Sequence, residues 1–198
     1  MPANDISDFL LKEYERISQA FFEARETTAK WVKYYLIIMA APFSFFAFMY
    51  KDKPRDFDIS LLPDTLSNLM WLIGFVGMFL AFIIIESSTD NILYARAVNG
   101  IRRIFMDREN EQFANIRQYV ILPTDIKKPR YLGWKKTLWI TIITGIINSC
   151  YISIGLSQTQ FFKNKASCPI GWMLGILFFI IHLAFYIINS LRKEKKDG

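Results

Sequence analysis

Residues 69–85 read LMWLIGFVGMFLAFIII and contain no charged side chain. A helix crosses the hydrocarbon core of a membrane with roughly 20 apolar residues, and about 17 residues is the lower limit. Backbone amides in lipid have no water to bond, so such a segment has to be helical. This stretch therefore predicts a membrane-spanning helix.

Three more stretches meet the same standard. They are residues 34–50, 137–156 and 170–189, and none of them contains Asp, Glu, Lys or Arg. A soluble chain of 198 residues could not cover four helices that are apolar on all sides. We therefore expect an all-α polytopic membrane protein with four transmembrane helices.

The overall composition excludes several other classes. Hydrophobic residues make up 53% of the chain, which is too many for an intrinsically disordered protein. Two cysteines are too few for a disulfide scaffold, and 9 Gly and 7 Pro are too few for a collagen-like chain. After these exclusions, the composition is that of a folded, strongly apolar protein.

The basic residues predict the orientation. Of the 24 Lys and Arg residues, 19 lie before the first span, between the second and third spans, or after the fourth. Basic residues concentrate on the cytoplasmic side of a membrane, so both termini and the middle segment are expected in the cytoplasm. Aromatic residues such as Trp31, Tyr34 and Tyr35 would then mark the inner interface. The net charge of +6 reports this topology, and we expect no direct nucleic-acid binding.

The cytoplasmic parts are expected to form a small helical cap. Residues 5–30 show apolar positions every three or four residues, and the second span can continue as a helix to Arg108. The predicted segments are a cytoplasmic amphipathic helix 1–33, spans 34–50, 69–86, 137–156 and 170–190, external loops 51–68 and 157–169, a cytoplasmic helical segment 87–136, and a basic tail 191–198.

Polar residues inside the spans are the main candidates for function, because such groups are costly in lipid. His182 and Asn148 lie at similar depths on the last two spans, so His182 is expected to bond to Asn148 or Ser149 and hold this hairpin together. The alternative is a proton- or voltage-responsive histidine. Glu86 is expected to pair with Lys136 or Arg192, or else to line the mouth of a cation pathway.

Small residues repeat at helical spacing along three spans and predict close helix packing, within the chain or between chains. They are Gly171 and Gly175, Gly145 and Ser153, and Gly77 and Ala81. Pro42 is a candidate hinge in the first span. Arg96, Arg102 and Arg103 are candidates for docking a partner or lipid headgroups.

Nothing in the sequence indicates an enzyme. The only histidine lies within a span, and the chain lacks a glycine-rich phosphate loop and a cluster of metal ligands. We therefore expect no catalytic residues, no metal and no cofactor.

Two stretches resemble a group of small bacterial four-span membrane proteins. The first contains EYER at 13–16, FEARE at 22–26 and Ala41-Pro42, and the second contains NGIRRIF at 99–105 and ILPTD at 121–125. The layout is also similar to membrane components of anti-phage systems, such as the membrane subunit of Kiwa or the accessories of type VI CRISPR loci. The resemblance implies a location in the bacterial inner membrane, but it carries no functional residue.

These observations lead to one main hypothesis and two alternatives. The first is an oligomeric inner-membrane component of a defence or stress system, which senses a membrane disturbance or forms a pore and docks a cytosolic protein. Membrane lipids and further copies of the chain would be its other partners. The alternatives are a small ion channel or carrier that uses His182, Asn148 and Glu86, and a structural membrane scaffold.

Overall fold

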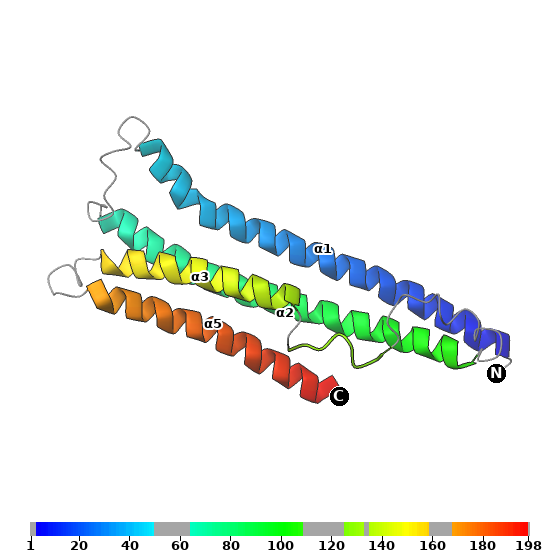
Figure 1. The fold of residues 1–198 in the computed structure, drawn as a ribbon. Coiled ribbons are helices and arrows are strands. Elements are labelled where there is room, and N and C mark those ends of the chain that lie inside the picture. The colour runs from blue at the N-terminus through cyan, green and yellow to red at the C-terminus, as the bar shows by residue number, and fades with distance from the viewer. Residues whose placement is uncertain (1–2, 50–63, 109–124, 133–134, 159–167, 198) are drawn as a thin grey trace.

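The computed structural model describes residues 3–49, 64–108, 125–132, 135–158 and 168–197. Within these ranges all regular structure is helical, as predicted. The helices are α1 (Ala3–Met49), α2 (Asp64–Arg108), α3 (Lys135–Ser157) and α5 (Cys168–Asp197). They run alternately in opposite directions, so the start of α1, the end of α2, the start of α3 and the end of α5 all lie toward one end of the bundle (Figure 1).

Three of the helices are long and apolar enough to cross a membrane. The most apolar 18-residue stretches within Thr65–Asp107 of α2, Lys135–Ser157 of α3 and Ile170–Lys196 of α5 have mean hydropathies of 2.4, 1.6 and 2.2. The predicted spans 69–86, 137–156 and 170–190 each lie on one of these three helices. The span predicted at 34–50 falls on the second half of α1 and stays a prediction, as does the cap. Most of both external loops lies outside the described residues.

Two helices are much longer than a span, since α1 has 47 residues and α2 has 45. The predicted amphipathic helix and the first predicted span are one continuous helix, and α1 also continues through Pro42. In Figure 1 the first half of α1 and the last half of α2 extend side by side beyond the start of α3. This paired extension carries most of the polar residues considered below.

The core is built on contacts of α2 with its neighbours. Its buried cluster consists of Tyr35 and Met39 from α1, Met70 and Ile84 from α2, and Tyr151 from α3. The Tyr151 hydroxyl donates a hydrogen bond to the Met39 carbonyl. Tyr35 was expected at the membrane interface, but it is only 1% exposed. The neighbouring Tyr34 is the exposed member of the pair, because consecutive residues of a helix point to different faces.

The small residues bring helices of the same chain together. A Cβ built on Gly155 would lie 2.5 Å from the Trp71 backbone nitrogen on α2. Gly175 and Gly171 of α5 lie against the carbonyls of Ser149 and Ser153 on α3, at 2.9 and 3.1 Å from an added Cβ. Gly145 and Ala81 are buried as well. These small residues therefore form contacts within the chain.

Large apolar side chains cover the outside of the bundle along the apolar helices. Phe79, Ile143, Trp139, Met173 and Ile176 are each at least half exposed. Exposing such a surface to water is unfavourable in free energy, whereas contact with lipid tails is not. The exposed surface thus agrees with the hydropathy of α2, α3 and α5.

Candidate functional site

Asn148 is the centre of a buried polar cluster between the helices. Its Nδ2 lies 3.1 Å from His182 Nε2, which is the hydrogen bond expected from the sequence. Tyr35 of α1 donates its hydroxyl to Asn148 Oδ1 at 3.1 Å and lies 3.2 Å from the Thr144 carbonyl. The second ring nitrogen of His182 lies 3.2 Å from the Phe178 carbonyl. These contacts link α1, α3 and α5.

The fourth long helix reaches the same point through a glycine. A Cβ built on Gly77 of α2 would collide with Met39 and with Asn148 Oδ1. Asn148 and His182 are both 0% exposed. Their polar groups are thus used in bonds between helices, and the cluster works chemically as an internal fastening. Ser149, the other expected partner of His182, has a buried hydroxyl without a partner among the described residues.

Glu86 is the last residue of the predicted second span 69–86 and is exposed. Within the described part of the chain, no ion pair joins it to Lys136 or Arg192. The pair found in this region is instead between Lys193 and Asp90, at 2.7 Å, and Lys193 also lies 2.8 Å from the Thr89 hydroxyl. The tail of α5 is therefore attached to α2 one turn beyond Glu86.

Arg96 joins α2 to the 125–132 segment and to the end of α5. Its side chain is 6% exposed, and its Nη2 contacts both carboxylate oxygens of Glu194 on α5. Its Nε donates to the Pro129 carbonyl at 2.9 Å, and its guanidinium lies over the Tyr131 ring at 4.4 Å. Arg96 thus holds residues 125–132 between α2 and α5. Nε and Nη2 of Arg96 bond within the chain. Of the three arginines predicted to dock a partner, Arg102 and Arg103 therefore remain as candidates.

Glu194 completes this arrangement. Besides Arg96, it accepts a hydrogen bond from the Tyr131 backbone N–H at 2.9 Å. Burial alone would raise the pKa of Glu194, but the Tyr131 N–H and the Arg96 guanidinium outweigh it and hold that pKa below its ordinary value. Sequence reasoning missed Glu194, because a carboxylate among the lysines of a basic tail is typical of a solvated segment.

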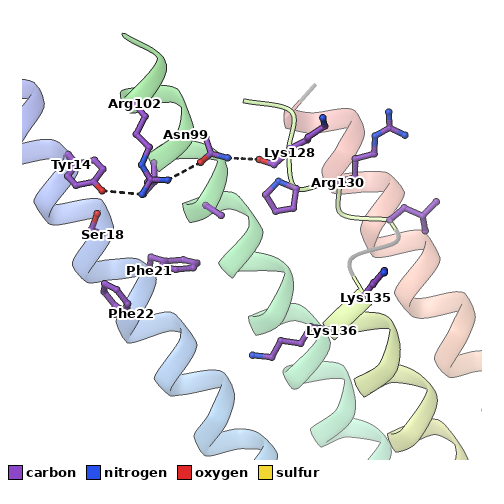
Figure 2. A pocket seen from close by; sticks show the side chains of 14 residues that line it. Tyr14, Ser18, Phe21, Phe22, Asn99, Arg102, Lys128, Arg130, Lys135 and Lys136 are labelled. Atoms are coloured by element: carbon purple, nitrogen blue, oxygen red, sulfur yellow. Dashed lines mark hydrogen bonds between the residues drawn. The ribbon is translucent and has the colours of Figure 1, made fainter. Parts of the chain in front are cut away.

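A groove lies beside this arrangement, over α2 and between α1 and α3 (Figure 2). Its volume is about 1090 Å³. The basic side chains that line it come from α2, from the 125–132 segment and from the start of α3. They are Arg102, Lys128, Arg130, Lys135 and Lys136, and none of the described lining residues is acidic.

Arg102 is held at the end of the groove by two hydrogen bonds. Its guanidinium donates to the Tyr14 hydroxyl at 3.2 Å and to Asn99 Oδ1 at 3.4 Å, as Figure 2 shows. Asn99 in turn donates to the Lys128 carbonyl at 2.9 Å. The hydrogen bond from Arg102 lowers the pKa of Tyr14. Arg103, by contrast, points away to a 3.5 Å contact with Asp107 and is 56% exposed.

Comparison with family models, with curated proteins and with solved structures finds no match for this chain. The described residues also contain no group of three His, Cys, Asp or Glu side chains that could hold a metal ion. Function must therefore be inferred from the two polar clusters, the groove and the exposed surface.

Proposed function

We propose that this protein is an inner-membrane component that docks a soluble protein on its cytoplasmic extension. In this proposal α1 supplies a fourth span and both termini face the cytoplasm. Exposed apolar side chains on the second half of α1 support the fourth span, among them Leu36, Ile37, Phe45 and Phe48. The distribution of basic residues supports the orientation.

The observation that carries the docking proposal is the set of exposed apolar side chains on the extension. Phe9 and Leu11 on α1 and Ile104 on α2 are exposed, although they lie outside the predicted spans. Exposed apolar side chains in water favour association with a partner. Arg103 lies beside Ile104 and supplies the exposed positive charge that the sequence analysis assigned to docking.

The structure favours docking over the alternatives. The polar groups of His182 and Asn148 bond to each other, so an ion path would have to break the helix fastening. The small-residue rows are used inside the chain and no longer support a homo-oligomer. We keep a bacterial defence or stress system as the proposed setting, because the expected four-span layout is similar to that of membrane components of anti-phage systems.

Copurification from native membranes tests the docking proposal. Full-length chain with Phe9→Ser, Leu11→Ser and Ile104→Ser should lose the proteins that copurify with the unmodified chain. Lys12→Ser with Glu15→Ser changes neighbouring exposed polar residues and should retain them. Equal recovery with both variants contradicts docking at this surface.

The proposed role in anti-phage defence needs a separate experiment. Cells that lack the protein should become more sensitive to phage, and the Phe9, Leu11 and Ile104 triple variant should fail to restore resistance. An unchanged plaque count after deletion would remove anti-phage defence from the proposal while leaving the docking result intact.

A further inference from the structure

The groove between α1 and α3 has a net positive charge that no acidic side chain among its described lining residues offsets. Arg130, Lys135 and Lys136 have no ion pair with any described residue. Lys128 has one, with Asp125 at 3.5 Å, but the side chains of both residues are largely exposed, so solvent weakens the pair. Cations gathered in a concave site raise the local concentration of anions. The charge of this groove therefore fits an anionic occupant.

The floor of the groove fits an apolar group. Phe21 and Phe22 of α1, Val98 of α2 and Leu132 of the 125–132 segment are among the residues that line it. Phe22 and Leu132 keep large exposed apolar areas. A volume of about 1090 Å³ is at the upper end for ligand pockets. An occupant with both an anionic and an apolar part would use the whole surface, whereas inorganic phosphate would use only the basic rim.

The groove also lies next to the predicted membrane surface. Lys135 and Lys136 are the first residues of α3, directly before the span predicted to begin at Thr137. On the opposite wall, α1 runs from Phe22 toward the exposed apolar side chains of Leu36 and Ile37. Basic pockets at the cytoplasmic ends of spans bind anionic lipid headgroups.

From the positive charge of the groove, its apolar lining and its position beside the predicted membrane surface, we propose that it binds one anionic phospholipid of the cytoplasmic leaflet. The phosphate lies among Lys128, Arg130, Lys135 and Lys136, which donate hydrogen bonds to it. The acyl chains pass over Phe22 and down the face of α1. Arg102 closes the cytoplasmic end of the site, where Tyr14 and Asn99 hold it.

Native mass spectrometry of the purified full-length chain tests the site, with phosphatidylglycerol and phosphatidylcholine as probes. The groove variant is Lys128→Gln, Lys135→Gln and Lys136→Gln. The matched control is Arg192→Gln, Lys195→Gln and Lys196→Gln, which removes the same charge from the exposed end of α5. A third protein with Lys135→Arg and Lys136→Arg keeps the charge of the groove.

We expect the unmodified chain to retain one phosphatidylglycerol in preference to phosphatidylcholine. The groove variant should bind it at least about tenfold more weakly, while the control and the arginine variant retain it. Excess glycerol phosphate should not displace the lipid, because it lacks the acyl chains that contact the floor.

Three results would overturn the proposal. An equal loss of phosphatidylglycerol binding in the groove and tail variants would show that the lipid is attracted by positive charge in general. Displacement by glycerol phosphate would show a site for a free phosphate compound. Unchanged lipid binding with loss of a copurifying acidic protein would show a protein site. If the groove variant does not fold, Lys136→Gln and Lys136→Glu are compared, and an unchanged affinity in both rejects the site.

Discussion

Nη2 of Arg96 lies 2.8 Å from Oε1 and 2.9 Å from Oε2 of Glu194, although the two residues are 98 positions apart in the sequence. The contact fastens the end of α5 to α2 outside the predicted spans. Through Pro129 and Tyr131 it also fixes the segment that forms one wall of the groove. The basic tail therefore has an architectural role in addition to its contribution to topology.

Removing the charge of Glu194 should loosen this region. Glu194→Gln weakens the contact with the Arg96 guanidinium and leaves a largely buried cation poorly compensated. We expect a loss of about 1–2 kcal/mol in the free energy of unfolding, because Glu194 keeps some solvent exposure. Thermal unfolding of the detergent-solubilised protein measures it. Lys195→Gln, on the same turn but exposed, is the control and should leave the melting temperature unchanged.

The same residue predicts a dependence on pH. The folded protein holds the pKa of Glu194 below its ordinary value of 4.5, so folding favours the charged carboxylate. Its stabilising contribution is therefore fully present above pH 4.5 and is lost as the pH falls through the lower folded-state pKa. The melting temperatures of the unmodified chain and Glu194→Gln should converge only in that acidic range. A gap that already closes near neutral pH would contradict the pairing.

Gly155 should not tolerate a methyl group. The Cβ of Gly155→Ala would meet backbone atoms of α2, with Trp71 N at 2.5 Å and the Ser67 carbonyl at 2.9 Å, and backbone cannot move aside as a side chain can. We expect a destabilisation of about 1–3 kcal/mol, typical of an overfilled contact. The measurement is again the melting temperature of the solubilised protein.

Gly100→Ala is the matched control for Gly155. Its Cβ would meet only Ile126 Cγ2, at 3.6 Å, which is an ordinary contact. Since Ala favours a helix over Gly by about 1 kcal/mol, this variant should be as stable as the unmodified chain or more stable. Equal destabilisation by both substitutions would mean that α2 and α3 are not packed at Gly155 as described.

The cluster around Asn148 should behave as a unit. Tyr35→Phe removes one hydrogen bond and should cost about 0.6 kcal/mol, as is usual between helices in a membrane. Asn148→Leu removes the bonds of Asn148 to both the Tyr35 hydroxyl and the His182 ring and should cost about 2 kcal/mol. The double variant should cost less than the sum of the two, because both changes remove the same bond.

Ser149→Ala tests whether the effect belongs to Asn148 alone. The Ser149 hydroxyl is buried but has no hydrogen-bond partner among the described residues, so its removal should change stability by less than about 0.5 kcal/mol. Strict additivity of Tyr35→Phe and Asn148→Leu, or a large effect of Ser149→Ala, would contradict the arrangement described for this cluster.

Sequence reasoning located the bond between Asn148 and His182, because both side chains are polar, lie at similar depth and belong to helices joined by a short connection. It placed Tyr35 at the membrane interface, where tyrosine is common. Only packing decides that Tyr34 faces outward while Tyr35 turns toward Asn148. Helix periodicity alone does not tell which face meets a neighbour.

The contact between Arg96 and Glu194 and the groove beside it were harder to predict from the sequence. Arg96 was noticed as one of several arginines, but its partner Glu194 lies in a run that is typical of solvated tails. The groove requires residues from α1, α2, the 125–132 segment and α3. Contacts over such separations depend on how the helices are aligned along the bundle, and local sequence patterns carry little information on that alignment.

The meeting of four helices at Asn148 has an evolutionary consequence. A larger residue at position 77, or an apolar one at 148, removes the space or the bonds on which Tyr35 and His182 depend. A lineage that changes one of these positions gains little until the others change as well. Across homologous chains, Tyr35, Gly77, Asn148 and His182 are therefore expected to be inherited or replaced together.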